Sequence, residues 1–267
     1  MFKRATAGFM VSAVLFSVSV LSSKTLNVLG IGNSLTVNAG KYIEGLASAS
    51  GNKLRYTGAV IMGASLKDHY STASINEAEP GNGRGKPYNV YGGKAGLKDI
   101  LRREKWDLVF FQQVSWSSHI AQSYRPYAGE LYAYIKKYSP GAEVCLLRTW
   151  AYREDLAESV LHMSSEEMDR EIVSACGIIS KELNCRVIPC GKAFMSAGNV
   201  PGLKSKLYTD GKHAGTYGEY LAGCVLFEAL FNQSCVGNTY VPSIEPEKIK
   251  QMQELAHEAA GIPEAKQ

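Results

Sequence analysis

The sequence predicts an α/β fold: one doubly wound domain of three layers, α/β/α, with helices on both faces of a central, mostly parallel sheet. Short apolar runs with strand character alternate along the chain with segments of helical periodicity, which is typical of parallel sheets. The length of 267 residues and the hydrophobic content of 45% suffice for one large domain with a buried core. The sequence contains neither internal repeats nor low-complexity tracts.

The chain begins with a segment that resembles a secretory signal peptide. Lys3 and Arg4 precede an apolar run over residues 7–21, and the small residues Ser22 and Ser23 follow it. The run is shorter than the ~20 residues that a membrane span needs. We therefore expect residues 1–23 to be removed, no stable membrane insertion afterwards, and a periplasmic or secreted protein. A retained N-terminal anchor is the alternative.

Residues 24–267 then form the domain, and five of its segments have the length and apolar composition of buried strands. They lie at residues 25–31, 54–62, 106–111, 143–147 and 186–189. The first run ends in Gly32-Asn33-Ser34, a sequence typical of a turn.

Apolar residues at helical spacing predict the helices of the domain. These helices cover residues 42–49, 97–103, 127–138, 164–183 and 217–231, and a C-terminal helix lies in the tail, residues 244–267. Ser164 or Ser165 opens the long helix with a capping box. Residues 71–93 are polar and rich in Gly, Pro and Asn, so we expect a long loop or lid there.

The charge balance argues against a nucleic-acid partner. The chain has 29 Lys and Arg against 25 Asp and Glu, a net charge of +4. Without Lys3 and Arg4 the numbers are 27 and 25, a net charge of +2. Nucleic-acid binding depends on a larger basic excess, because phosphate contacts dominate the affinity.

Cysteine spacing gives no sign of a metal site. The six cysteines include no C-x-x-C pair and have no neighbouring His, so we expect neither a zinc site nor a cofactor. In an exported chain Cys185 can pair with Cys190, or Cys224 with Cys235, and the spacing does not decide between bonded and free thiols.

Polar motifs follow the predicted strands, where the loops of a parallel sheet collect functional groups. They are Gly32-Asn33-Ser34-Leu35, Gly63-Ala64-Ser65-Leu66, Gln112-Gln113-Val114-Ser115 and, before a late helix, Asp210-Gly211-Lys212-His213. Each motif alone has a structural explanation, such as a turn or a helix cap. Together they supply every part of an acyl-transfer site.

These motifs resemble the blocks of the SGNH hydrolases, also called GDSL-type esterases, over about residues 25–235. Gly32-Asn33-Ser34-Leu35 matches the first block, Gly63 the glycine of the second, and Asp210-Gly211-Lys212-His213 the last. The third block departs from the usual Gly-x-Asn-Asp and carries Gln, as in carbohydrate-esterase branches. The resemblance implies the SGNH or flavodoxin-like form of the predicted fold.

The resemblance also implies catalytic roles that suit the side chains. Ser34 is the expected nucleophile, and a serine hydroxyl needs an adjacent base. His213 can accept the Ser34 proton and return it to the leaving alcohol, while Asp210 orients the imidazole.

A developing oxyanion needs hydrogen-bond donors already aimed at it. The expected donors are the backbone N–H groups of Ser34 and Gly63 and a side-chain amide. Neighbouring side chains of a strand point to opposite faces, so we expect only one of Gln112 and Gln113 to enter the site. The resemblance favours Gln112 for the amide, and Gln113 is the alternative. Three further residues are candidates for substrate binding: His69, Trp116 and His119.

The leading hypothesis is a serine esterase that removes a small acyl group, with acetyl as the first candidate, from a carbohydrate. Its partner would be a small-molecule or glycan ester. A carbohydrate O-acyltransferase with the same triad is the second hypothesis, because an acyl-enzyme at Ser34 serves both reactions. A non-catalytic glycan-binding protein of the same fold is the third.

Overall fold

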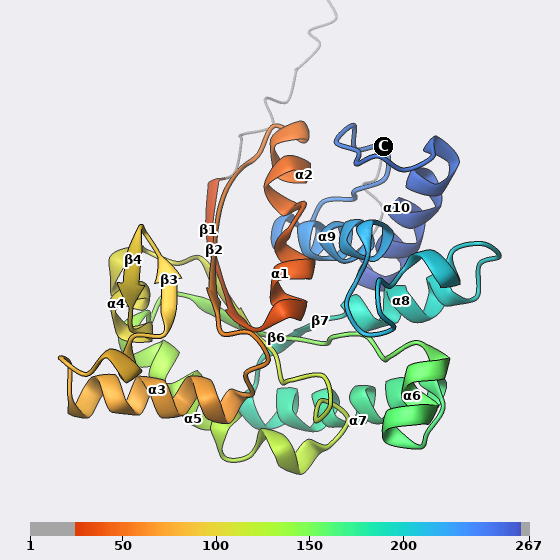
Figure 1. Cartoon of the computed structure of the whole chain (residues 1–267). Helices are drawn as coiled ribbons and strands as arrows, with labels where there is room; N and C mark the ends of the chain where they lie inside the picture. Colours follow the sequence, from red (N-terminus) through yellow and green to blue (C-terminus); the bar gives the residue numbers. More distant parts are fainter. Residues whose placement is uncertain (1–24, 263–267) are drawn as a thin grey trace, which may run out of the picture.

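A parallel sheet fixes the architecture of the protein. The computed structural model describes residues 25–262. Its main sheet contains, in spatial order, β2 (Lys53–Val60), β1 (Thr25–Gly32), β5 (Leu108–Phe111), β6 (Glu143–Leu147) and β7 (Arg186–Ile188). All neighbouring pairs are parallel. The predicted doubly wound sheet is confirmed, and its order is the flavodoxin-like one (Figure 1).

The central strands are apolar on both faces because helices cover both. In β5, Leu108 and Phe110 point into one hydrophobic core, whereas Val109 and Phe111 point into the other. β1 alternates in the same way, which follows from the two-residue period of a strand. Such continuous apolar runs are the sequence signature of a buried parallel sheet.

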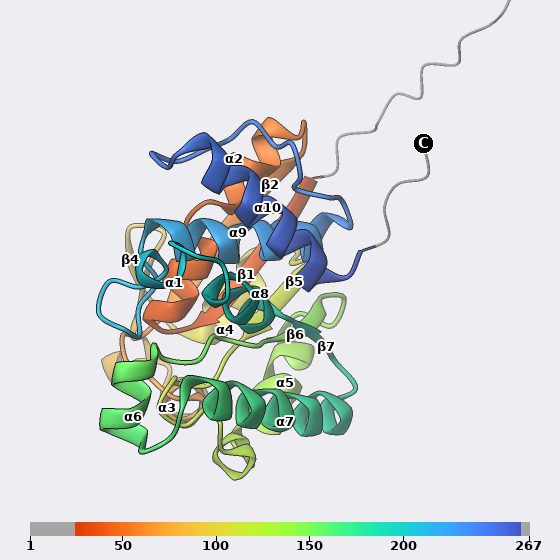
Figure 2. The same cartoon turned by 90° about the vertical axis from the view of Figure 1, so that its right-hand side faces the viewer.

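Two layers of helices enclose the sheet (Figure 1). One layer, seen from its own side in Figure 2, contains α1 (Ser34–Gly40), α2 (Ile43–Ala49), α8 (Cys190–Gly198), α9 (Thr216–Phe231) and α10 (Pro246–Ala260). The opposite layer contains α3 (Leu66–Ala78), α4 (Leu97–Arg103), α5 (Tyr127–Tyr138) and α7 (Ser165–Leu183), with α6 (Glu154–Leu161) beside α7. Short 3-10 turns lie at Gly83–Gly85, Ala121–Tyr124 and Lys204–Lys206.

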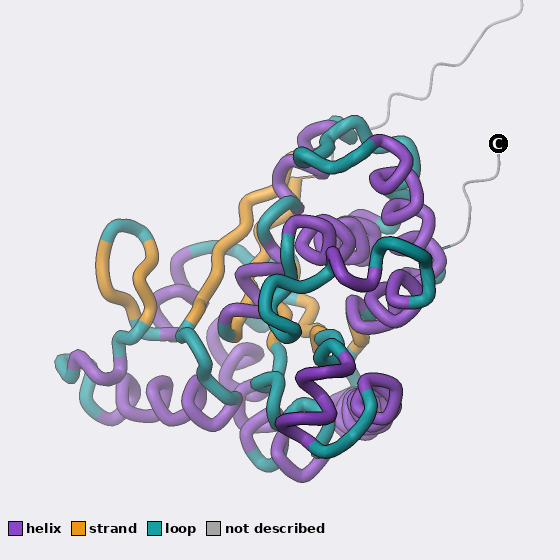
Figure 3. Tube along the Cα trace, turned by 45° about the vertical axis from the view of Figure 1, so that its right-hand side comes forward, coloured by secondary structure: helices purple, strands orange, loops and turns teal. Residues whose placement is uncertain are grey.

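The prediction of one long loop over residues 71–93 is wrong. Its first part belongs to α3, and its last part pairs as the antiparallel hairpin of β3 (Tyr88–Val90) and β4 (Gly93–Ala95), which stands apart from the main sheet (Figure 3). Ser65 starts α3 through a capping box with Asp68. The buried face of α3 includes His69 and Asn76, so its apolar stripe is too thin to recognise in the sequence.

Helix α1 is a second element that sequence periodicity does not predict. It begins directly after β1 and packs so closely on the sheet that a Cβ at Gly30 would lie 2.9 Å from Cγ2 of Thr36. Glycine in β1 therefore permits the approach of α1. Helices α6 and α8 are also unpredicted, because eight or nine residues show little periodicity.

The expected signal segment, residues 1–23, lies outside the described residues. Within residues 25–262, no helix is both long enough and apolar enough to cross a bilayer. All six cysteines have free thiols in this structure, and only Cys185 is not fully buried.

A buried ion pair joins the sheet to α7. Arg148, which follows β6, places Nη2 at 2.6 and 2.7 Å from the two carboxylate oxygens of Asp169. The two side chains are only 10% and 14% exposed. Burial raises the pKa of Asp169, although the neighbouring Arg148 guanidinium opposes this effect. Each of the two buried charges is therefore stabilised by the presence of the other.

We predict that Asp169→Ala lowers the free energy of unfolding by about 3–5 kcal/mol, because it leaves the Arg148 charge buried without a partner. Urea denaturation measures the loss. The double substitution Arg148→Met with Asp169→Leu should recover most of it. Glu254→Ala, which breaks the exposed Lys250–Glu254 pair, serves as the control and should change the midpoint little. An equal loss of stability in Asp169→Ala and in the control Glu254→Ala would contradict the prediction.

Candidate active site

Ser34 is the first residue of α1 and lies at the carboxyl end of β1. Asn33 caps this helix: its side-chain oxygen accepts from the Leu35 backbone N–H at 3.1 Å. The Asn33 amide also donates to the Ala64 carbonyl oxygen at 2.9 Å. One buried side chain thus fixes the turn that carries Ser34 and ties it to the loop after β2.

His213 and Asp210 share a tight turn before α9. Both the His213 N–H, at 2.7 Å, and the Lys212 N–H, at 3.0 Å, donate to Oδ1 of Asp210. Gly211 takes the left-handed conformation, with φ of +87°, that this turn requires. The carboxylate therefore shapes the same turn that carries the imidazole.

The three side chains form a continuous chain of hydrogen bonds. Ser34 Oγ lies 2.9 Å from Nε2 of His213, and Nδ1 of His213 lies 2.6 Å from Oδ2 of Asp210. Partial burial opposes ionisation of Asp210. Hydrogen bonds from the His213 N–H, the His213 ring and the Lys212 N–H outweigh it and hold the pKa of this carboxyl well below its usual range. Asp210 is therefore a carboxylate at neutral pH.

Side chains from other loops hold this turn in place. Trp150, fully buried and stacked on Phe194, donates its indole N–H to the Lys212 carbonyl oxygen at 2.9 Å. The Arg153 backbone N–H donates to the Gly211 carbonyl oxygen at 2.7 Å. Trp150 thus has a buried, supporting position behind the turn.

Asn38 clamps the same turn from the other side. Its amide accepts from the Ala214 N–H at 3.3 Å and donates to the Ala214 carbonyl oxygen at 3.5 Å. The amide also donates to Oε1 of Glu219 on α9 at 3.0 Å. Asn38 and Ser34 are four residues apart on α1, so they lie on the same side of the helix.

A shallow cavity of about 240 Å³ opens beside Ser34. It is lined by Asn33, Ser34, Met62, Gly63, Val114, Ser115, Trp116, Lys212 and His213. Met62 is 70% exposed and Trp116 is 48% exposed. Large apolar side chains at such exposure on the rim of a cavity offer a surface to a ligand.

Two residues that line this cavity have backbone N–H groups without a protein partner in the described chain. Within residues 25–262, neither the Ser34 N–H nor the Gly63 N–H donates to a protein acceptor. Gly63 has a φ of +69°, and a Cβ there would meet nothing closer than Trp116, at 4.0 Å. Glycine is therefore required at position 63 by its backbone conformation and not by lack of space.

The expectation that Gln112 or Gln113 supplies an amide to the cavity needs correction. Gln113 is buried, and its amide donates to the Ser123 carbonyl oxygen and accepts from the Leu66 and Val114 N–H groups. Gln112 is also buried. When its amide is oriented to match its neighbours, it accepts from the Asn33 N–H at 3.2 Å and donates to the Gln113 carbonyl oxygen. Neither side chain lines the cavity.

His69 and His119 also lie away from the cavity, contrary to expectation. His69 is fully buried in α3, and its ring stacks on Tyr88 and hydrogen-bonds the Tyr88 hydroxyl at 2.9 Å. Burial lowers the pKa of His69 to about 4, so it is a neutral core residue. His119 lines a separate cavity with Met163 and Arg170. Trp116 does line the Ser34 cavity.

Sequence reasoning assigned no role to Met62, Val114, Ser115 or Lys212, although all four line the cavity. Each lies beside or within a recognised motif. Their closeness to a motif in the sequence could therefore have pointed to them. The sequence does not show, however, which of these side chains point into the cavity.

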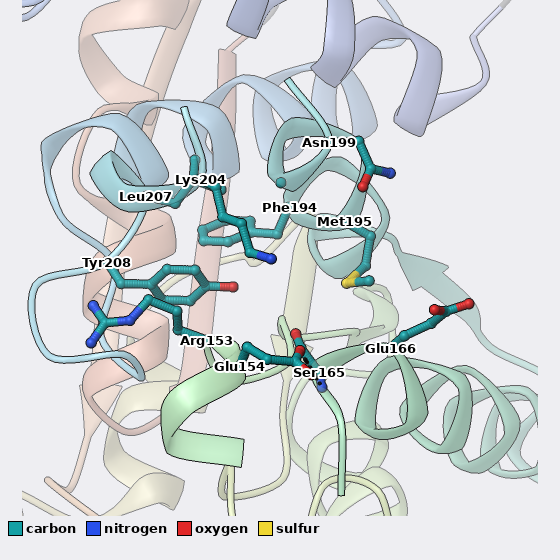
Figure 4. Close-up of a pocket in the computed structure, with 11 residues that line it drawn as sticks. Arg153, Glu154, Ser165, Glu166, Phe194, Met195, Asn199, Lys204, Leu207 and Tyr208 are labelled. Carbon is teal, nitrogen blue, oxygen red and sulfur yellow. Dashed lines mark hydrogen bonds between the residues drawn. The ribbon is translucent and has the colours of Figure 1, made fainter. Parts of the chain in front are cut away.

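A second cavity, of about 310 Å³, has Tyr208, two residues before Asp210, in its lining. Figure 4 shows Arg153, Lys204 and Tyr208 along one side of it and Met195 and Glu166 along the other. Its one serine, Ser165, donates its hydroxyl to the Tyr152 carbonyl oxygen at 2.7 Å, and no histidine is among its lining residues. This cavity lacks a nucleophile paired with a base.

Comparison with solved structures places the fold. A DUF4886 family protein from Bacteroides uniformis shares 28% identity, with a TM-score of 0.79 over 91% of this chain and 98% of that one. A candidate SGNH hydrolase from Slackia heliotrinireducens shares 24% identity, with a TM-score of 0.57 over 78% and 100%. A lipase/acylhydrolase from Enterococcus faecalis shares 16%, with a TM-score of 0.51 over 77% and 95%.

The resemblance to SGNH hydrolases is thus confirmed for the fold. No sequence among the curated proteins matches the chain. The family model described as "Domain of unknown function (DUF4886)" matches residues 27–261, nearly the whole described domain. The chain therefore belongs to the DUF4886 family.

Proposed function

We propose that this protein is a serine esterase that hydrolyses a small acyl ester, with acetyl as the expected group, on a carbohydrate. The observation that carries the proposal is the continuous hydrogen-bonded chain from Ser34 through His213 to Asp210. Both distances are within hydrogen-bond reach of a nucleophile, its base and the group that orients the base. The structural neighbours, which include a lipase/acylhydrolase, support ester chemistry.

In the proposed reaction, Ser34 Oγ attacks the ester carbonyl carbon while Nε2 of His213 takes the hydroxyl proton. Asp210 stabilises the resulting imidazolium through Nδ1. The oxyanion that develops on the carbonyl oxygen is stabilised by the free N–H groups of Ser34 and Gly63. The imidazolium then gives its proton to the leaving alcohol, which leaves an acyl group on Ser34. Nε2 of His213 then takes a proton from water as the water oxygen attacks the acyl carbon. The bond to Ser34 Oγ breaks, the imidazolium returns the proton to Ser34, and the free acid leaves.

The size of the cavity favours a small acyl group. Its volume of about 240 Å³ is below the range of ~300–1,000 Å³ typical of sites for larger ligands. The alcohol side of the ester would extend over Trp116, whose half-exposed ring is suited to stacking on the apolar face of a sugar. A signal peptide over residues 1–23, which we also propose, would bring the enzyme to extracytoplasmic glycans.

We predict that Ser34→Ala and His213→Ala each lower kcat for a chromogenic acetate ester by about 10⁶-fold, and Asp210→Asn by about 10⁴-fold. A triad acts as a unit, so the double variant Ser34→Ala with His213→Ala should be no slower than either single variant. Steady-state kinetics of the purified protein give these values.

Two exposed residues provide matched controls for these variants. Ser74→Ala and His162→Asn change a serine and a histidine outside the cavity and should leave kcat unchanged. Activity that survives Ser34→Ala would exclude the serine mechanism. If the protein transfers acetyl to an added sugar and releases no acetate, it is an acyltransferase and not an esterase.

We predict that Trp150→Phe lowers kcat about tenfold, because it removes the N–H that holds the Lys212 carbonyl but keeps a ring stacked on Phe194. Trp106→Phe is the matched control. Trp106 is also buried and donates its indole N–H to a carbonyl oxygen, that of Ile100, in the opposite core. The two variants should lose similar stability by thermal unfolding, and only Trp150→Phe should lose kcat. Equal kinetic losses would contradict a specific role for Trp150.

We predict that Trp116→Ala raises KM for an acetylated oligosaccharide by about tenfold, the equivalent of ~1.4 kcal/mol of lost ring stacking. KM for a small acetate ester should change much less. Ile120→Ala is the control, because Ile120 has similar exposure, 46%, but lines a different cavity. Equal changes in KM for both esters would argue against a sugar platform at Trp116.

A further inference from the structure

The oxyanion site is incomplete on the side of β5. Ser34 and Gly63 supply backbone donors from the loops after β1 and β2, whereas the glutamine amides after β5 are used in buried hydrogen bonds. Val114 and Ser115 occupy that side of the cavity. Ser115 is only 4% exposed and belongs to the wall of the cavity that Ser34 and Gly63 also line.

The Ser115 hydroxyl has one protein partner, the hydroxyl of Tyr152. Ser115 Oγ and Tyr152 Oη are 2.9 Å apart. Tyr152 follows β6 and is 3% exposed, and within residues 25–262 its hydroxyl has no other acceptor. Ser115 lines the cavity, where its proton can meet a ligand or solvent, whereas Tyr152 is not among the lining residues of the cavities. A buried hydroxyl proton without an acceptor is costly, so the favoured arrangement has Tyr152 donating and Ser115 Oγ accepting.

The direction of this bond leaves the Ser115 proton free. Ser115 Oγ makes no other hydrogen bond within the described chain, so its proton is available to a ligand in the cavity. Burial raises the pKa of Tyr152, which keeps the phenol protonated and able to donate. A hydroxyl that already accepts a hydrogen bond is a stronger donor, because the two bonds polarise each other.

Both residues are held rigidly enough to aim that proton. The Ser115 carbonyl oxygen accepts from Ser118 Oγ at 2.9 Å, which fixes the turn after β5. The Tyr152 carbonyl oxygen accepts from Ser165 Oγ at 2.7 Å, which ties the loop after β6 to α7. A donor fixed before the reaction costs no reorganisation when charge develops.

We propose that the Ser115 hydroxyl is the third donor of the oxyanion hole and that Tyr152 is its positioning residue. This inference rests on the proposed function. When Ser34 attacks the ester, the carbonyl oxygen becomes an oxyanion and accepts hydrogen bonds from the Ser34 N–H, the Gly63 N–H and Ser115 Oγ–H. The Ser115 proton remains on Ser115 throughout, and Ser115 forms no covalent bond to the substrate.

The kinetic test compares variants of the full domain with a chromogenic acetate ester. Ser115→Ala should lower kcat by about 10²–10³-fold with little change in KM, because the donor acts on the transition state. Tyr152→Phe should lower kcat by about tenfold on its own. In the Ser115→Ala background it should cause no further loss, since both substitutions remove one interaction. Additive losses would overturn the role of Tyr152.

Ser118→Ala is the matched control for Ser115→Ala. Ser118 is a neighbouring buried serine that supports the same turn but does not line the cavity. It should lose stability similarly by urea denaturation, and its loss of kcat should be at least tenfold smaller than that of Ser115→Ala, because the Ser115 hydroxyl is kept. If Ser118→Ala loses as much kcat as Ser115→Ala, Ser115 acts through the turn only and the inference is wrong.

A covalent probe separates failure of this inference from failure of the esterase function. Diethyl 4-nitrophenyl phosphate should react with Ser34: the Ser34 Oγ–P bond forms, 4-nitrophenolate leaves, and the hydroxyl proton passes to His213 and then to solvent. The phosphoryl oxygen of the adduct takes the place of the oxyanion. Mass spectrometry identifies the labelled peptide, and nitrophenolate release gives the rate.

The outcomes of the probe are distinct. Labelling of Ser34 that is at least tenfold slower in Ser115→Ala than in Ser118→Ala supports the donor role. Equal labelling rates together with unchanged esterase activity in Ser115→Ala overturn that role alone. A wild-type protein that neither hydrolyses the acetate ester nor becomes labelled at Ser34 overturns the esterase function and this inference with it.

Discussion

The parallel alignment of the sheet is the constraint on which the site depends. Because β1, β2, β5 and β6 run in the same direction, the loops after their carboxyl ends meet at one edge of the sheet. Ser34, Gly63, Ser115 and Trp150 come from four of these loops, although they are distant in the sequence. The strands are buried on both faces, so any slip in their pairing would expose apolar side chains and displace the loops together. The same pairing of the strands therefore both buries the core and aligns the loops of the site.

Much of the fold could be predicted from the sequence, and the exceptions have physical reasons. Helices α4 and α5 and strand β6 match their predicted residues, since clear breaks in apolar periodicity bound each of them. Ser164, of the two serines considered, caps α7. Helix α3 could not be predicted, because its buried face contains His69 and Asn76 and its contacts are tertiary.

The positions of the candidate triad could be predicted from the sequence better than the surroundings of the cavity. Ser34, Asp210 and His213 lie together as the motifs suggested, because strand ends and a three-residue spacing constrain them locally. The directions of Gln112 and Gln113 could not be inferred, since the alternation of side chains no longer holds beyond the end of β5. Both amides instead point into the protein, where they hydrogen-bond backbone N–H and carbonyl groups of the surrounding loops.

The placement of Ser34 and Asn38 on one helix has a consequence for motion. Asn38 hydrogen-bonds the Ala214 backbone beside His213, so α1 carries the proposed nucleophile and also holds the turn of the proposed base. A small rigid shift of α1 over the sheet would move Ser34 and His213 together and preserve the distance between them. Within residues 25–262, Val114 and Ser115 after β5 share no hydrogen bond with α1 and would stay behind. Such a shift would thus change the distance from Ser34 to the Ser115 hydroxyl, the proposed third donor, while the hydrogen bond between Ser34 and His213 would keep its geometry.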